Sequence, residues 1–205
     1  DLGVIRLARK IVPELPLHAS TQMTVTNSGG VEFAMQAGLE RTVLARELSL
    51  EEIKAACDVG TEIETFIHGA LCVCYSGQCL MSSMLGGRSG NRGRCAQPCR
   101  LPYTLWDERG KKCSMPGEYL LSPKDLCGIE QIKALAEAGV YSFKIEGRMK
   151  QKEYATGVVS LYRKYIDAYL EGKDVVVSKA DQKRIFDLGN RKGFTQAYFT
   201  KQNDP

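Results

Sequence analysis

The sequence predicts an α/β fold in which a parallel sheet is covered by helices. Along the first 70 residues, strand patterns alternate with helical patterns, and the alternation resumes after residue 117. Alternating units of this length place consecutive strands side by side in parallel. Polar side chains also recur on one face of several strands, where a barrel would have its interior.

The first elements are defined by hydrophobic spacing and by helix-end signals. Helices are predicted over residues 5–11, 28–37 and 49–57, and strands over residues 15–23, 41–47 and 61–68. Ser49 and Glu52 form a capping box, in which a serine and a glutamate three residues later satisfy the first backbone N–H groups of a helix. Gly38 is expected to end the second helix.

The second group of elements follows a cysteine-rich loop at residues 72–117. Strands are predicted over residues 118–121 and 141–146, and helices over residues 122–138 and 151–171. The last helix carries tyrosines and aliphatic residues at helical spacing, which we assign to the core. We therefore divide the chain into a partial (β/α) domain, residues 1–171, and a polar C-terminal appendage, residues 172–205.

Composition limits the classes of protein to be considered. Hydrophobic residues make up 43% of the 205 residues and charged residues 25%, as in ordinary soluble globular proteins. No apolar run approaches the ~20 residues that span a bilayer, so no membrane role is expected. The net charge of +4 is too small to indicate nucleic acid by itself. Because the chain begins at Asp1 without a signal-peptide pattern, we expect a cytoplasmic fragment of a longer protein.

Four cysteines, Cys72, Cys79, Cys95 and Cys99, fall within 28 residues that are rich in glycine and arginine. Thiolates grouped in this way are disulfide partners or ligands of a soft metal centre, and a reducing cytoplasm favours the metal. The gaps of six, fifteen and three residues make a poor zinc finger and suit a [4Fe–4S] cluster. Zinc remains the alternative, and Cys74 and Cys127 are reserve ligands.

Strand alternation gathers polar side chains that we expect around one pocket at the carboxyl ends of parallel strands. The alternative is an ion-pair network that only holds a barrel together. Because the pattern recurs on four strands, we favour the pocket. The expected set is Gln22, Arg46, Glu64, His68, Lys144, Glu146 and Arg148.

Four sequence blocks then resemble the U32 peptidase family, also called the collagenase-like proteases. The first, over residues 64–82, reads Glu-x-Phe-x-x-Gly-Ala-Leu-Cys-x-x-x-x-Gly-x-Cys-x-Met-Ser. The others are Arg-Gly-Arg-Cys-Ala-Gln-Pro-Cys-Arg at residues 92–100, Ser-Pro-Lys-Asp-Leu at residues 122–126 and Lys-Ile-Glu-Gly-Arg at residues 144–148. They follow the order of the family across roughly residues 15 to 170.

This resemblance implies a TIM-barrel-like (β/α) domain, of which the chain would be the C-terminal portion. Better-understood members look like iron–sulfur enzymes for oxygen-independent hydroxylation of a tRNA wobble uridine, a ribosomal cytidine or a ubiquinone precursor. The blocks look closest to the tRNA 5-hydroxyuridine type. The resemblance therefore implies RNA and a small-molecule hydroxyl donor as partners. The oligomeric state is left open, and a dimer would fit.

With this reading, each candidate residue receives an expected role. Glu64, His68 and Glu146 are the candidate acid–base groups, and Gln22, Arg46, Lys144 and Arg148 are expected to bind substrate. Arg92 and Arg94 are expected to contact the RNA backbone.

Two other classes of function stay open. A peptidase would need a thiolate paired with an imidazole, and the sequence has only His18 and His68, with no His-Glu-x-x-His or Gly-x-Ser-x-Gly motif. A binding module without catalysis would use the metal only for stability.

Overall fold

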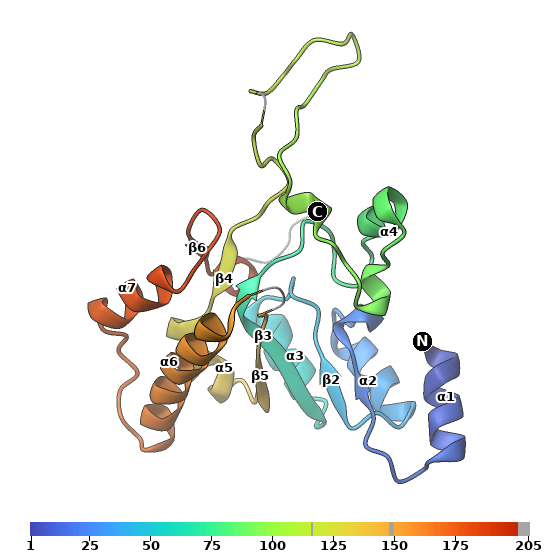
Figure 1. Ribbon diagram of the computed structural model, residues 1–205. Helices are drawn as coiled ribbons and strands as arrows, with labels where there is room; N and C mark the ends of the chain where they lie inside the picture. The colour runs from blue at the N-terminus through green and yellow to red at the C-terminus, as the bar shows by residue number, and fades with distance from the viewer. Residues whose placement is uncertain (116, 148–149, 201–205) are drawn as a thin grey trace.

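A computed structural model of the chain describes residues 1–115, 117–147 and 150–200 and has a mixed α/β fold (Figure 1). Four strands pair in parallel and in sequence order: β1 (His18–Ala19), β2 (Arg41–Val43), β3 (Glu62–Ala70) and β5 (Ser142–Ile145). β4 (Asp125–Cys127) runs antiparallel to the end of β3, and β6 (Phe194–Thr195) pairs with β4 in parallel. The parallel sheet is confirmed, but within the described residues it stays open and does not close into a barrel.

The helices pack around this sheet. The α-helices are α1 (Leu2–Ile11), α2 (Ser28–Gln36), α3 (Leu50–Cys57), α4 (Met81–Gly86), α5 (Ile132–Glu137), α6 (Lys152–Leu170) and α7 (Lys179–Asp187). Short 3-10 helices occupy Thr21–Met23, Gly90–Arg92, Pro98–Arg100, Ile129–Gln131 and Ala197–Thr200. Among the described residues, we find no helix with the length and apolar character needed to cross a bilayer.

The helix-end signals act as the sequence predicts. The Ser49 hydroxyl accepts from the Glu52 N–H, and the Glu52 carboxylate accepts from the Ser49 N–H at 2.7 Å, so the capping box is confirmed. After α2 ends, Gly38 adopts a φ of +81°, which favours glycine. Local side-chain chemistry therefore sets the ends of these helices.

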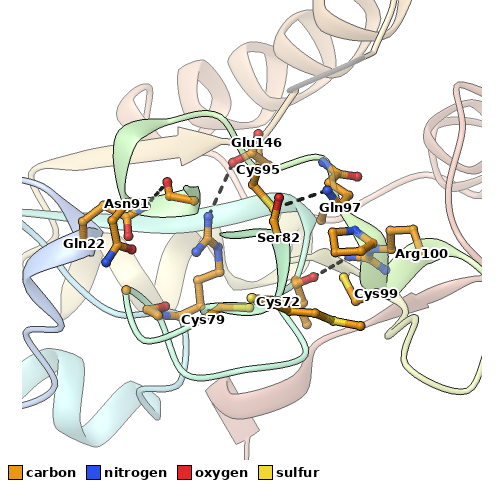
Figure 2. A pocket seen from close by; sticks show the side chains of 18 residues that line it. Gln22, Cys72, Cys79, Ser82, Asn91, Cys95, Gln97, Cys99, Arg100 and Glu146 are labelled. Atoms are coloured by element: carbon orange, nitrogen blue, oxygen red, sulfur yellow. Dashed lines mark hydrogen bonds and ion pairs between the residues drawn. The ribbon is translucent and has the colours of Figure 1, made fainter. Parts of the chain in front are cut away.

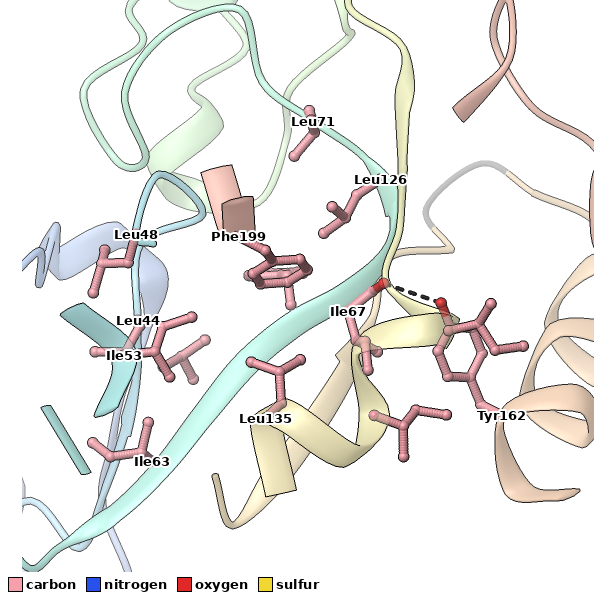
Figure 3. Packing of buried hydrophobic residues seen from close by; sticks show 14 of the residues in the cluster. Leu44, Leu48, Ile53, Ile63, Ile67, Leu71, Leu126, Leu135, Tyr162 and Phe199 are labelled. Carbon is pink, nitrogen blue, oxygen red and sulfur yellow. Dashed lines mark hydrogen bonds between the residues drawn. The ribbon is translucent and has the colours of Figure 1, made fainter. Parts of the chain in front are cut away.

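The core lies where α3, α5 and α6 cover the sheet (Figure 3). Ile63 and Ile67 of β3 are completely buried, together with Leu135 of α5 and Val158 of α6. Burying each such aliphatic side chain contributes about 1.5–3 kcal/mol. The aromatic stripe of α6 is confirmed as core, since Tyr162 is 2% exposed.

The sequence prediction is wrong over residues 118–127 and correct for the helix that follows at Ile132–Glu137. No regular strand forms over residues 118–121, where the described contact is an isolated bridge between Glu118 and Tyr103. Residues 122–138 do not form one helix, because Asp125–Cys127 pairs with the end of β3 and only the later residues are helical. Cys127 therefore lies in a strand, and this long-range pairing overrides the local helix signal.

The segment that follows residue 171 is joined to the domain, although the boundary itself stays a prediction. Ile185 of α7 and Phe199 lie in the main core, 2% and 8% exposed. Lys164 of α6 forms an ion pair with Asp181 of α7 at 2.6 Å. Ile185 and Phe199 therefore complete the hydrophobic core, although the segment around them is polar.

Candidate functional site

A cavity of about 130 Å³ lies between the end of β3 and residues 72–100 (Figure 2). We call these residues, the first part of the cysteine-rich loop, the cysteine-rich segment. All four predicted cysteine ligands line it. So do three of the predicted pocket residues, Gln22, Arg46 and Glu146. Residues from five distant parts of the sequence therefore meet at one site, which we call the cysteine cavity.

Two glycines allow the chain to approach itself closely at this cavity. Gly69, near the end of β3, has a φ of +107°, and a Cβ built there would lie 2.3 Å from the backbone oxygen of Glu146. Gly77 has a φ of +77°, and its Cβ would lie 2.6 Å from Thr24 Oγ1. Both positions need glycine, because any other side chain would be strained and would clash with a neighbouring segment.

Buried hydrogen bonds fix the first half of the cysteine-rich segment. The Ser76 hydroxyl and its backbone N–H both donate to Glu47 Oε1 at 3.1 Å. The same hydroxyl accepts from the Arg46 N–H at 3.1 Å. Ser82 Oγ accepts from the Ala96 N–H at 3.0 Å and so ties the two halves of the segment together.

Arg100 closes the segment against the sheet. Its half-buried guanidinium donates to Pro123 O at 2.7 Å, to Ser122 Oγ at 3.0 Å and to Leu71 O. Leu71 precedes Cys72, and Arg100 follows Cys99, so the guanidinium holds these two cysteines on the same wall. This is why cysteines 27 residues apart in sequence line one cavity.

Neighbouring thiols affect the pKa values of Cys72 and Cys99. Burial is the main cause that raises the pKa of Cys72, and neighbouring Cys79 and Cys99 raise it further while Arg46 opposes them. Burial also raises the pKa of Cys99, with Arg100 lowering it and Cys95 and Cys79 raising it. The four thiols are therefore electrostatic neighbours, as a shared soft-metal centre requires.

Across the described parts of the chain, no three His, Cys, Asp or Glu side chains are grouped closely enough to hold a single metal ion. The thiols nevertheless share one cavity and have the chemistry of iron–sulfur ligands. Cys74, a reserve ligand, also lies near Cys79, since this neighbour raises its pKa after burial does.

An ion pair stands at the edge of the cavity. Arg46 Nη2 lies 3.4 Å from Glu146 Oε2, and its guanidinium stacks 3.8 Å from the centroid of the Phe66 ring. Both charged side chains are mostly covered, with 12% and 22% of their surface exposed. Charged groups held this way are oriented before any ligand arrives.

Glu64, near the start of β3, forms an ion pair with Lys144 of β5, and neither residue lines the cavity. The Lys144 ammonium lies 2.8 Å from Glu64 Oε1, and the Ser142 hydroxyl donates to Glu64 Oε2 at 2.9 Å. Burial alone would raise the pKa of Glu64, but these bonds and Arg41 lower it overall. For these two residues, the structure therefore fits the alternative interpretation, in which polar side chains form an ion-pair network and do not line a pocket.

The structure places His68 away from the cavity, against expectation. A β-bulge between Phe66 and His68 shifts the register with β5, so that Phe66 pairs with Lys144 but His68 pairs with Ile145. One extra residue turns the following side chain to the opposite face. His68 is 1% exposed there, with Nδ1 3.2 Å from Tyr162 Oη, and burial lowers its pKa to about 4.

The remaining predicted residues fall in three places. Gln22 donates to Gly90 O at 3.4 Å across the cavity. Arg92 and Arg94 are exposed on the loop that precedes Cys95 and are not lining residues. Arg148 lies outside the described residues. Cys127, the other reserve ligand, lies near Tyr162 on the far face, with its sulfur 3.9 Å from Tyr162 Oη.

Sequence reasoning missed several lining or supporting groups, including Ser76, Ser82 and Gln97. Ser82 and Gln97 belong to the sequence blocks over residues 64–82 and 92–100, so their presence in those blocks was the available signal. Their roles arise from contacts between distant segments, which spacing does not reveal.

Comparisons with known proteins found a family profile and several named relatives. The sequence profile of Peptidase family U32 matches residues 1–205. The chain is 42% identical to tRNA hydroxylation protein P1 of Bacillus subtilis, covering 97% of the chain and 49% of that protein. It is 46% identical to the 23S rRNA 5-hydroxycytidine C2501 synthase of Escherichia coli, over 83% of the chain and 26% of that protein.

A third relative carries a different description. The chain is 41% identical to an uncharacterized protease of Methanocaldococcus jannaschii, over 99% of the chain and 51% of that protein. The chain thus spans about half the length, or less, of these relatives. No solved structure matches it significantly. With the profile matching from end to end, the chain belongs to Peptidase family U32.

Proposed function

We propose that this chain is part of an enzyme that hydroxylates an RNA pyrimidine, with the wobble uridine of tRNA as the first candidate. The observation that carries the proposal is the cysteine cavity, where four thiols and an oriented Arg46–Glu146 pair line one space. Two relatives named for tRNA and rRNA hydroxylation support the choice of RNA.

We propose that Cys72, Cys79, Cys95 and Cys99 hold a [4Fe–4S] cluster, with zinc as the alternative metal. The shared cavity and the softness of thiolate ligands support this assignment. When bound, the cluster would supply the redox or Lewis-acid chemistry that hydroxyl transfer without oxygen requires.

The chain's own side chains would bind and orient the reactants. The Arg46 guanidinium can donate to an anionic or carbonyl oxygen at the cavity, while Glu146 keeps it in position. The Glu146 carboxylate can also accept a proton from a group in the cavity. Gln22 can bind the edge of a base through its side-chain amide. A small-molecule hydroxyl donor would have to enter the same space.

The loop that precedes Cys95 supports an RNA partner. Arg88, Arg92 and Arg94 are exposed there, and Arg88 Nε donates to Arg94 O at 2.9 Å, which keeps the loop compact. Guanidinium groups at the surface bind phosphates without regard to sequence. We therefore propose that this loop contacts the RNA backbone while a base enters the cavity.

The structural evidence favours hydroxylation over proteolysis. A cysteine protease needs an imidazole next to its thiolate, and His68 is buried on the opposite face against Tyr162. His18 lies exposed in β1 and is not among the described lining residues.

Three further proposals accompany this function. The sequential order of β1, β2, β3 and β5 supports a place for this chain within a (β/α) barrel. The RNA partner supports a cytoplasmic location. The dimer remains a proposal for the oligomeric state.

The proposal is tested by deleting the gene and analysing tRNA nucleosides by mass spectrometry. We expect a 5-hydroxyuridine derivative to disappear, and the gene encoding the natural protein to restore it. The Cys79→Ala variant should fail to restore it, whereas Cys113→Ala, at an exposed cysteine away from the cavity, should succeed. Unchanged nucleosides, together with gelatin cleavage by the pure protein, would favour the peptidase instead.

A further inference from the structure

A long hairpin-like loop extends from the wall of the cysteine cavity into solvent (Figure 1). We call residues 101–120, as far as they are described, the ribbon arm. Its two sides are joined by bonds from Cys113 N–H to Leu105 O at 2.8 Å and from Tyr103 N–H to Glu118 O at 2.8 Å. Asp107 Oδ1 accepts from the N–H groups of Arg109 and Lys111 and so shapes the turn. The arm is therefore preformed.

Two large apolar side chains of the arm, Leu105 and Trp106, are exposed to solvent. Trp106, the single tryptophan of the sequence, is 53% exposed, and Leu105 beside it is 56% exposed. Exposed aromatic residues with polar neighbours are typical of interaction sites. We therefore expect these exposed side chains of the ribbon arm to contact a partner.

The two faces of the arm differ in chemistry. Trp106 pairs with Lys112 across the ribbon, and the Lys112 ammonium lies 5.2 Å from the centroid of the indole ring. Because successive residues in extended backbone point to opposite sides, we infer that Leu105 lies on the other face from Trp106. One face is therefore aromatic and cationic, and the other is aliphatic.

We propose that the face of Trp106 and Lys112 binds single-stranded RNA, with a base stacked on the indole and a phosphate near the ammonium. This rests on the proposed function and adds a second contact region to it. Aromatic rings next to basic groups bind unpaired nucleotides in this way. An aliphatic protein partner would instead prefer the Leu105 face.

The position of the arm agrees with this assignment. Pro98, Cys99 and Arg100 line the cysteine cavity, and the arm begins at the next residue. Tyr103 Oη donates to Pro98 O at 2.9 Å and anchors the base of the arm to that wall. Trp106 is five residues further on, about 17 Å at the rise of an extended strand. It would therefore contact a nucleotide that flanks the reacting base.

The charge at the tip of the arm also fits an RNA partner. Three basic residues, Arg109, Lys111 and Lys112, outnumber the two acidic ones at the turn, Asp107 and Glu108, and Asp107 is engaged by backbone N–H groups. Basic side chains near a stacking residue add the salt-dependent attraction to phosphates.

The test measures binding of a fluorescein-labelled, uridine-containing single-stranded RNA of about 12 nucleotides by anisotropy. We expect Trp106→Ala to raise the Kd by about 5- to 100-fold, as for the loss of one stacked base. The matched control is Leu105→Ala, an equally exposed residue on the other face, which should change the Kd less than about twofold. Lys112→Ala should reduce the slope of log Kd against log salt by about one.

Each of the following results would overturn the proposal, and they are distinguishable. If the natural protein binds this RNA and Trp106→Ala binds it equally well, the arm proposal fails while the proposed function stands. If the natural protein does not bind RNA, both fail. If Leu105→Ala weakens binding as much as Trp106→Ala, or if sedimentation shows that Trp106→Ala abolishes self-association, the arm is a protein-docking element.

Discussion

Lowering the pH from 7 to 5 should destabilise this protein through His68. The imidazole is buried against Tyr162, and burial, followed by the positive charge of Lys150, lowers its pKa to about 4. In the unfolded chain the pKa returns to about 6.5. The unfolded state therefore binds more protons in this range, and stability rises with pH.

The size of the effect follows from these two values. Stability from His68 is fully present above about pH 6.5 and is lost as the pH falls towards 4. Integrated between pH 7 and pH 5, the loss is about 2 kcal/mol in the free energy of unfolding. Glu64 and Asp181, whose pKa values are lowered in the fold, lose their contribution only near and below about pH 4.

The assay is urea denaturation at pH 7, 6 and 5 for the natural protein and two variants. His68→Asn cannot titrate, so its stability should change little over this range, whatever its absolute value. His18→Asn, at the other histidine, should keep the full loss of about 2 kcal/mol. Equal stability of the natural protein at pH 7 and pH 5 would show that His68 is not buried as described and would reopen its role in catalysis.

Two substitutions test the architecture of the cavity. Gly69→Ala should lower the free energy of unfolding by about 2 kcal/mol or more in urea denaturation, because alanine is strained at a φ of +107° and its Cβ would meet Glu146 O. Gly60→Ala, also at positive φ but with nothing within 4 Å of its Cβ, serves as the control and should cost less. Arg100→Gln should lower the iron bound per protein and the melting temperature, because it removes bonds to Leu71, Ser122 and Pro123. Unchanged iron content in this variant would mean that Arg100 does not hold Cys72 and Cys99 together.

The helices could be predicted because their signals are local. The capping box at Ser49 and the stripe of α6 need only neighbouring residues, and both appear in the structure. β4 was missed because it depends on pairing with the end of β3, which lies more than 50 residues away. A Ser-Pro-Lys-Asp run has the local pattern of a helix start, and the distant partner decides otherwise.

The candidate site was likewise predicted from the sequence only in part. Cysteine spacing predicted that four thiols belong together, and all four line one cavity. The predicted position of His68 beside the cavity was wrong because strand alternation assumes an unbroken register, and the sequence pattern does not reveal a bulge. Similarly, nothing in the sequence distinguishes the Glu64–Lys144 pair below the cavity from the Arg46–Glu146 pair that lines it.

The most direct test of the account is the amount of iron and acid-labile sulfide in protein purified without oxygen. If Cys72, Cys79, Cys95 and Cys99 hold a [4Fe–4S] cluster, the protein should contain about four of each per chain. Cys79→Ala should lower both, and Cys113→Ala should leave them unchanged. Protein that binds zinc but no iron, or that keeps its iron and sulfide in the Cys79→Ala variant, would contradict the assignment of this cavity.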